Sequence, residues 1–385
     1  MELKPRVLEQ HIAVFGESGS GKTVLVSCFY GAMLQPEFTK PSLFNVTADD
    51  VGKGSQLYKN YLGMRDSARR PEGTRFSSTP YAFSVKLKNK GGGAKSPKLF
   101  EAVRLVWHDY PGEWWQADPS VPEEAQRRVD TFKSLLGSDV AFLLVDGQKV
   151  LDNAGEEERY LKSLLGDFKT GLLTLKDQLL EDAKPLVKFP RIWILALSKA
   201  DLLPELNVYD FRDLVIGKAN DDLDALREAL AEFVDSPDAL AVGEDFVRFS
   251  SAKFEPNRIE VTERIGLDLV LPLAAMLPFE RHIKWVEQKQ AGEKVAEELL
   301  KTAPALAAAL LSKAAFAGPI GRLVALVGVR VLNAVKVASN LGVDQLRTMN
   351  RDALAKHDYM AAVLTRFGLD LDDGEDQGVL LRSTK

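Results

Sequence analysis

The sequence is poor in cysteine and histidine and carries no excess of basic charge. Its one cysteine, Cys28, excludes an internal disulfide and suits a reducing compartment. The four histidines share no helix-type ligand spacing with one another or with this cysteine, which argues against a structural zinc site. A formal net charge of -5 gives no electrostatic reason to expect a nucleic acid partner. We therefore expect any bound metal to be a hard cation held by oxygen atoms.

A secretory signal is also missing, because the first ten residues carry both charge signs and no apolar core, and we expect a cytoplasmic protein. Residues 314–338 are rich in valine, leucine and alanine. However, Arg322, Arg330 and Lys336 would each cost about 2.5 to 3.5 kcal/mol near the centre of a bilayer. These residues share one polar stripe of a helical projection, so we expect a helix buried in a bundle. Peripheral contact with a membrane, or with a partner's groove, is the alternative.

Short apolar runs alternate with helical patterns over the first 278 of the 385 residues. This alternation predicts an α/β domain with a mostly parallel sheet between two layers of helices. The runs at 81–88 and 102–107 are expected to pair as a hairpin. The expected strands are 10–15, 81–88, 102–107, 140–145, 191–197 and 246–249, and the expected helices lie around 121–136, 156–182 and 219–234.

Some segments depart from this alternation. Between residues 36 and 79 there is little periodicity, which predicts a long, partly mobile connection. Residues 152–190 are charged and leucine-rich and are expected to form a helical insertion. From 279 onward no strand pattern follows and alanine, leucine, lysine and glutamate dominate, so we expect a helical region over 279–370 and a flexible tail over 371–385.

The segment from Gly16 to Thr23 fits the pattern G-x-x-x-x-G-K-[ST] at every fixed position. Its glycines allow several backbone N–H groups to point at phosphate oxygens, while Lys22 reaches the terminal phosphates and the Thr23 hydroxyl is suited to Mg²⁺. The strand expected before it and the helix after it are the context that such a loop needs. We predict a nucleoside triphosphate site formed here by Gly16, Glu17, Ser18, Gly19, Ser20, Gly21, Lys22, Thr23 and Val24.

A second candidate segment, Asp109-Tyr110-Pro111-Gly112, follows the expected strand at 102–107. Asp109 is suited to the magnesium shell, and the Gly112 N–H to the terminal phosphate. Alone, this pattern is also that of a turn that closes a strand. Its position along the chain favours the nucleotide site.

Two further segments indicate guanine as the base. In the segment from Ser198 to Asp201, the Asp201 carboxylate can accept two hydrogen bonds from the guanine edge, and the Lys199 stem can lie along the base. Guanine-binding loops of this kind usually begin with asparagine or threonine, and here Ser198 stands at that position. The segment from Ser250 to Lys253 is similar to a loop whose backbone contacts the guanine carbonyl, and we assign Ser251, Ala252 and Lys253 to the site. The alternative for the first segment is a solvated turn.

Taken together, these four segments resemble the translation-factor-related class of P-loop GTPases over residues 10–255. The fragment from Asp109 to Trp114 resembles the bacterial YcjX-type and double-GTPase-type families. The resemblance implies a Ras-like core with extra helices, GTP, GDP and Mg²⁺ as ligands, a cytoplasmic location and a switching role. It leaves the effector or GTPase-activating partner unidentified.

Such a protein needs a threonine that completes the magnesium shell, and we favour Thr74 over Thr79 because Thr74 lies further from the strand. Gly112 is followed by Glu113, where efficient GTPases commonly have glutamine, so we expect slow intrinsic hydrolysis. Lys22, Thr74, Gly112 and Glu113 are the candidate catalytic residues. Arg69, Arg70 and Arg75 are either solvated loop charges or include an arginine finger in cis.

The leading hypothesis is a GTP-hydrolysing conformational switch. A dynamin-like membrane GTPase is favoured only if residues 314–338 bind lipid. A binding scaffold with little hydrolysis is suggested by the missing glutamine. A small-molecule kinase would leave the two guanine segments without a role.

Overall fold

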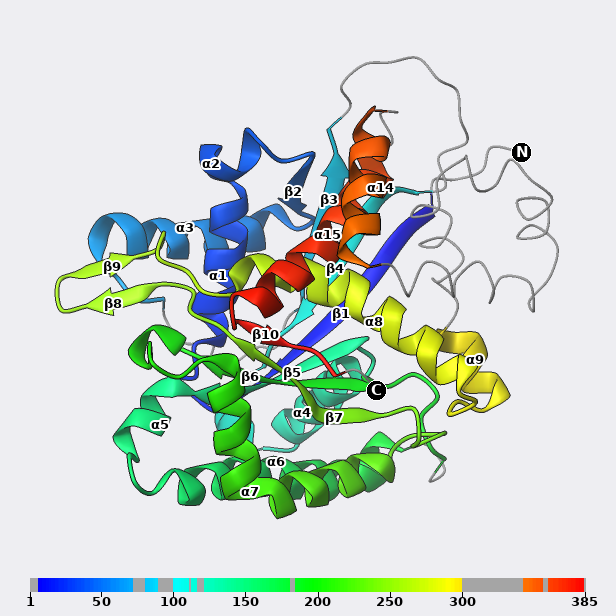
Figure 1. Cartoon of the computed structure of the whole chain (residues 1–385). Helices are drawn as coiled ribbons and strands as arrows, with labels where there is room; N and C mark the ends of the chain where they lie inside the picture. The colour runs from blue at the N-terminus through cyan, green and yellow to red at the C-terminus, as the bar shows by residue number, and fades with distance from the viewer. Residues whose placement is uncertain are drawn as a thin grey trace.

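The computed structural model describes residues 6–71, 80–88, 100–110, 112–115, 121–180, 184–299, 342–355 and 359–383. Their centre is an eight-stranded sheet with the order β10-β7-β6-β5-β1-β4-β3-β2 (Figure 1). The strands of this sheet are β1 (Arg6–Phe15), β2 (Phe44–Ala48), β3 (Tyr81–Leu87), β4 (Phe100–His108), β5 (Val140–Asp146), β6 (Ile192–Ser198), β7 (Ala241–Arg248) and β10 (Leu380–Leu381).

The middle of the sheet is parallel and its edges are antiparallel. β1 pairs in parallel with β4 and β5, and the parallel pairing continues through β6 to β7. β3 is antiparallel to β4 and β2, and β10 is antiparallel to β7. The mostly parallel sheet and the pairing of the runs at 81–88 and 102–107 are therefore confirmed. Every residue of β5 and β6 is buried, because helices cover both faces of the sheet at its centre.

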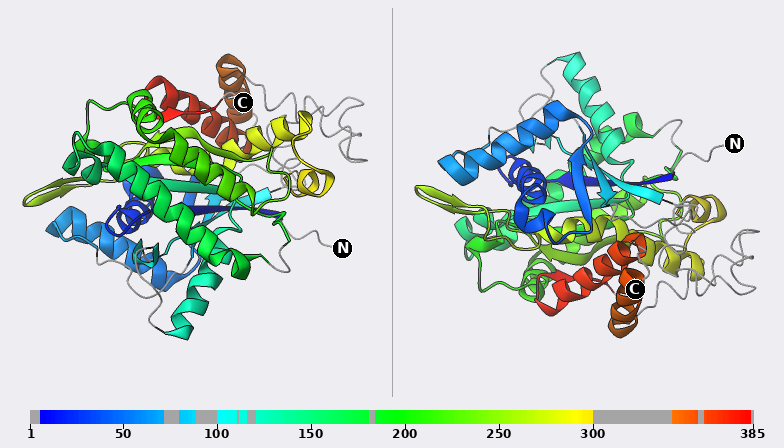
Figure 2. Two further views of the ribbon diagram at one scale, coloured as in Figure 1. Left: turned by 90° about the horizontal axis from the view of Figure 1, so that it is seen from below. Right: turned by 90° about the horizontal axis from the view of Figure 1, so that it is seen from above.

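Two helical layers complete the sandwich (Figure 2). On one face α4, α6 and α7 pack around Phe15 and Trp193, and on the other α1, α3, α8 and α15 pack around Ile12 and Val14. The helices and 3₁₀ turns are α1 (Lys22–Met33), α2 (Pro36–Thr39), α3 (Val51–Ser67), η1 (Gly112–Trp115), α4 (Pro122–Leu135), α5 (Gly147–Asp152), α6 (Glu157–Leu179), η3 (Ala200–Leu202), α7 (Val208–Ala231), η4 (Leu267–Leu269), α8 (Val270–Glu287), α9 (Glu293–Leu299), α14 (Val343–Ala355) and α15 (Tyr359–Asp376). A short hairpin of β8 (Lys253–Glu255) and β9 (Arg258–Glu260) stands apart from the sheet.

The segment expected as a helical insertion, 152–190, contains α6. This helix connects the parallel strands β5 and β6 and buries one side against the sheet and α7. Tyr160, Leu164 and Phe168 recur at helical spacing on its buried side. The segment thus supplies the crossover that two neighbouring parallel strands require.

The prediction of a long, partly mobile connection between residues 36 and 79 is wrong over most of its length, because this segment contains α2, β2 and α3. Three glycines within α3 weaken its helical pattern in the sequence. At one of them, Gly54, an added Cβ would lie 2.6 Å from the Cβ of Ala48, so the glycine lets the helix pack closely on β2. Leu57, Tyr61 and Met64 then bury the inner face of the helix.

The prediction of a flexible tail over 371–385 is also wrong as far as Ser383, which is the last described residue. α15 continues to Asp376, and Leu380 of β10 is fully buried beside β7. Two acidic residues of this segment form ion pairs, since Arg382 lies 2.6 Å from both Asp372 and Glu375.

The helical C-terminal region is present, although it begins before the composition changes. The expected boundary at residue 278 falls inside α8, which packs over β1. The segment 314–338, on which a membrane contact depends, lies outside the described residues. Among the helices that the structure describes, none combines the length and apolar character that crossing a bilayer requires.

Candidate functional site

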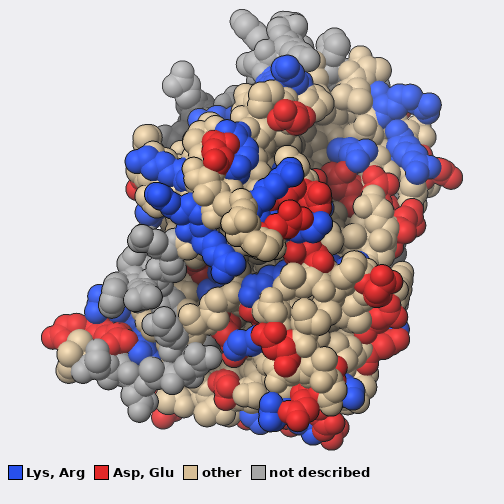
Figure 3. Space-filling view, turned by 90° about the vertical axis from the view of Figure 1, so that its left-hand side faces the viewer, with Lys and Arg blue, Asp and Glu red and all other residues tan. Residues whose placement is uncertain are grey.

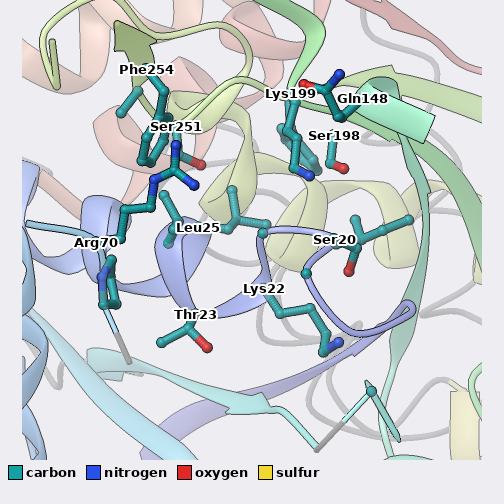
Figure 4. A pocket seen from close by; sticks show the side chains of 18 of the residues that line it. Ser20, Lys22, Thr23, Leu25, Arg70, Gln148, Ser198, Lys199, Ser251 and Phe254 are labelled. Atoms are coloured by element: carbon teal, nitrogen blue, oxygen red, sulfur yellow. The ribbon is translucent and has the colours of Figure 1, made fainter. Parts of the chain in front are cut away.

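A cavity of about 580 Å³ opens where the parallel strands end, and all four candidate segments contribute to it (Figure 4). The segments follow the carboxyl ends of β1, β4, β6 and β7, which lie close together in the sheet. Its lining residues are Ser18, Gly19, Ser20, Gly21, Lys22, Thr23, Val24, Leu25, Arg70, Pro71, Asp109, Tyr110, Gly112, Leu144, Gln148, Ser198, Lys199, Asp201, Leu202, Phe249, Ser251, Ala252 and Phe254.

The glycine-rich loop joins β1 to α1 and turns through two left-handed residues. Gly19 has φ 81° and Gly21 has φ 92°, values that residues with a Cβ rarely adopt. Gly21 is the N-cap of α1, and its carbonyl accepts the first helical hydrogen bond from the Leu25 N–H. The first turn of the helix therefore directs its free N–H groups at the cavity.

The Lys22 side chain is buried and folded back over the loop. Its Nζ donates to the carbonyl oxygens of Gly16, at 2.7 Å, and Glu17, at 3.0 Å. Burial lowers the pKa of Lys22, and the charges of Asp109 and Glu17 oppose this shift. A cation held this way by neutral carbonyls is suited to transfer its hydrogen bonds to an anion in the cavity.

Tyr110 and Gly112 hold the second segment against the loop. The Tyr110 hydroxyl accepts from the Gly16 N–H at 3.0 Å and donates to the Gly16 carbonyl at 3.2 Å. A Cβ added to Gly112 would lie 2.3 Å from the backbone nitrogen of Ser18, so only glycine fits there. The role of Tyr110 was missed because the D-x-x-G pattern leaves that position open.

Asp109 and Thr23 are suited to a magnesium ion. Asp109 is buried, burial raises the pKa of its carboxyl to about 6, and the charge of Lys22 opposes that shift. A carboxylate that lacks water is stabilised by a cation, and oxygen ligands are those that Mg²⁺ prefers. The part of the chain that the structure describes holds no group of three or more His, Cys, Asp or Glu side chains suited to a metal. Thr74, Thr79 and Arg75 lie outside the described residues.

Hydrogen bonds connect the two segments that are expected to bind the base. Asp201 Oδ1 accepts from the Ser250 hydroxyl at 2.7 Å, and the Ala200 N–H donates to the Phe249 carbonyl at 3.0 Å. Ser250 was not assigned to the site from the sequence, although it precedes the assigned residues directly. The Lys253 side chain is not among the lining residues and lies 3.6 Å from Glu255.

Two ion pairs around α5 connect these loops, and the sequence did not reveal them. Lys199 Nζ lies 2.7 Å from Asp146, which is buried at the end of β5, and Lys149 Nζ lies 2.8 Å from Glu17. Asp146 also caps α5 by accepting from the Gln148 N–H. An aspartate that ends a fully apolar strand at this edge of the sheet was the signal that could have indicated it.

The structure thus brings most of the predicted residues to one cavity. Gly16 and Glu17 shape the loop without lining the cavity. Glu113 lies in the 3₁₀ turn η1. The carboxyl ends of the parallel strands point to the left in Figure 1, so Figure 3 shows this side of the molecule. Basic and acidic side chains are mixed there.

The strand order and the glycine loop define an α/β protein with the P-loop fold. No family model matches the chain, and no curated protein matches it. Among solved structures it is similar to a nucleolar GTP-binding protein 1 from Plasmodium falciparum, with 12% identity, a TM-score of 0.34 and coverage of 77% of this chain and 97% of that one. A signal recognition particle receptor complex, SRb-GTP/SRX, from Chaetomium thermophilum has 18% identity, a TM-score of 0.32 and coverage of 64% and 93%.

A bacterial dynamin pair has 15% identity and a TM-score of 0.26, with coverage of 97% of this chain and 66% of that one. The assignment of the fold rests on the sheet order and on the loop between β1 and α1.

Proposed function

We propose that this protein binds GTP and GDP with Mg²⁺ and hydrolyses GTP to GDP and phosphate. One observation carries the proposal: a single cavity is lined both by the phosphate loop with Lys22 and by Asp201. Residues of the remaining two segments, Asp109, Tyr110, Gly112, Ser251 and Ala252, line the same cavity.

The base preference follows from hydrogen-bond chemistry. Guanine presents two neighbouring N–H donors on one edge, which a carboxylate can accept together, whereas adenine presents an acceptor at the corresponding ring nitrogen. The Ser250 hydroxyl donates to Asp201 Oδ1 and so fixes the orientation of this carboxylate. The Lys199 stem, held by Asp146, supports one face of the base.

Hydrolysis would take place at the loop end of the cavity. Thr23 and Asp109, with Thr74, would hold Mg²⁺, which when bound supplies positive charge to the phosphates. Lys22 and the Gly112 N–H would contact the terminal phosphate. With Glu113 after Gly112, turnover is expected to be slow without a partner protein.

The nucleotide would act as a switch. Because Gly112 lies against Glu17 and Ser18, a terminal phosphate at the loop and its loss on hydrolysis would change the position of η1 and of the segment around Thr74. The C-terminal helices would pass this change to an unidentified effector in the cytoplasm.

Calorimetric titration with GTP, GDP and ATP in Mg²⁺ tests the proposal. The wild type is expected to bind both guanine nucleotides and to bind ATP weakly, and Lys22→Ala to lose most of the affinity. Asp201→Asn is expected to weaken GTP binding, and Asp213→Asn, which changes an exposed carboxylate on α7, to leave it unchanged. Equal or tighter binding of ATP by the wild type would contradict the proposal.

A nucleotide-binding scaffold with little hydrolysis is the second candidate, and Glu113 is the observation that favours it. A single-turnover assay with GTP and Mg²⁺ separates the two. Phosphate release supports the GTPase, and tight GTP binding without release supports the scaffold.

A further inference from the structure

The open side of the cavity carries a paired arginine and phenylalanine that no motif includes. Arg70 follows α3 and the left-handed residue Ala68, which ends that helix with φ 49°. Its guanidinium carbon lies 5.3 Å from the centre of the Phe254 ring, within the range of a cation–π contact. Both side chains line the cavity.

Both residues lie at the end of the cavity that the base segments form. Phe254 comes two residues after Ala252, with Lys253 between them, and belongs to β8. The hairpin of β8 and β9 lies beside α3 (Figure 1), which keeps the ring close to Arg70. The pair therefore belongs to the base end of the site.

Lys199 stands on the other side of the same space. Figure 4 shows Arg70, Ser251 and Phe254 on one side of the cavity and Lys199 on the opposite side, with Lys22 and Thr23 below them. A flat ring placed between these two sides would have the Lys199 stem on one face and the arginine and phenylalanine on the other. Asp201 lines the same cavity and would offer its carboxylate to the edge of the ring.

We infer that Arg70 and Phe254 close the guanine site by contacting the base on the face opposite Lys199. The inference rests on the proposed function. A guanidinium and an aromatic ring are both flat and apolar on their faces, so both stack on a purine, and the cation adds attraction to its π electrons. The pair would hold the base in place and slow its dissociation.

This role differs from that of an arginine finger. A finger acts on the terminal phosphate, so its removal slows hydrolysis and leaves GDP binding unchanged. A residue that holds the base acts equally on GDP and GTP, because both carry the same base. The two roles therefore predict different results for one substitution.

The experiment measures dissociation of N-methylanthraniloyl-labelled GDP, and of a non-hydrolysable GTP analogue with the same label, by stopped-flow fluorescence. Arg70→Ala and Phe254→Ala are each expected to speed dissociation of both nucleotides about tenfold. Arg70→Lys is expected to lie between them and the wild type, because it keeps the charge and loses the flat group. In the double variant, the increase in the dissociation rate is expected to be smaller than the product of the two single increases, since each residue holds the other in place.

Arg69→Ala is the matched control, because Arg69 is the neighbouring arginine and does not line the cavity. Melting temperatures show whether each variant is folded, and Phe254→Tyr, which keeps the ring, should behave as the wild type. Arg70→Ala and Phe254→Ala rates equal to those of Arg69→Ala would overturn the inference, as would an Arg70→Ala effect confined to the GTP analogue. Failure of the wild type to bind either labelled nucleotide would instead refute the proposed function.

Discussion

Gly112 shows how a single position constrains the site. A Cβ there would lie 2.3 Å from the Ser18 nitrogen and 2.4 Å from the Glu17 carbonyl carbon, and backbone atoms of the phosphate loop cannot move aside cheaply. Gly166, by contrast, lies in α6 with no atom within 4 Å of an added Cβ. The two glycines therefore differ in what a methyl group would do.

Gly112→Ala is expected to weaken GTP binding by tenfold or more, which corresponds to about 1.4 kcal/mol, because the methyl group displaces the segment from the loop. Calorimetry measures the change. Gly166→Ala is the control and should leave the affinity unchanged. GTP binding by Gly112→Ala that equals the wild type would show that the second segment is not held against the loop.

Cys28 gives a second prediction at this scale. The thiol is fully buried in α1, and burial raises its pKa to about 12. At pH 8 it should therefore not react with a thiol reagent in the folded protein, and one thiol should react in denaturant. Rapid reaction of the native protein would mean that α1 is less tightly packed than the structure shows.

At the scale of elements, the sequence predicted the strands and helices whose patterns are long and regular. The fully apolar β5 and β6 and the alternating β3 are examples. It missed α3, because glycines needed for close packing on β2 weaken its pattern. It missed the end of α15 and the β10 that follows, because Asp372 and Glu375 of α15 form ion pairs with Arg382 that only the folded chain brings together.

A buried ion pair connects α8 with β7, next to the end of the chain. Arg281 lies 2.8 Å from Asp245, both are almost fully buried, and the Ser383 N–H donates to the same carboxylate. Removing Asp245 leaves the buried Arg281 with only a longer contact, 3.6 Å, to the carboxylate of Glu244. This contrasts with exposed pairs such as Arg212 and Asp213.

Asp245→Ala is expected to lower the free energy of unfolding by about 3 to 5 kcal/mol. Urea denaturation followed by circular dichroism measures the loss. The control Asp213→Ala, at the exposed pair, should change it by less than about 1 kcal/mol. A similar small loss for Asp245→Ala would mean that the C-terminal strand contributes little to the fold.

For the whole molecule, the position of the site follows from the parallel sheet. Four segments far apart in the sequence each follow a strand, and the carboxyl ends of those strands meet at one edge. The sequence could therefore predict the phosphate and base segments. It could not predict the pairing of Arg70 with Phe254, because their roles depend on which side chains face each other across the cavity.

The most direct test of guanine recognition replaces Asp201 with asparagine and asks whether the preferred base changes from guanine to xanthine. Xanthine replaces the exocyclic amino donor of guanine with a carbonyl acceptor, and an asparagine amide can donate to that carbonyl while a carboxylate cannot. Competition binding of GTP, XTP and ATP to the wild type and to Asp201→Asn should show a reversal, with the wild type preferring GTP and the variant preferring XTP. An unchanged order of preference in Asp201→Asn would contradict the central claim that this carboxylate reads a guanine base.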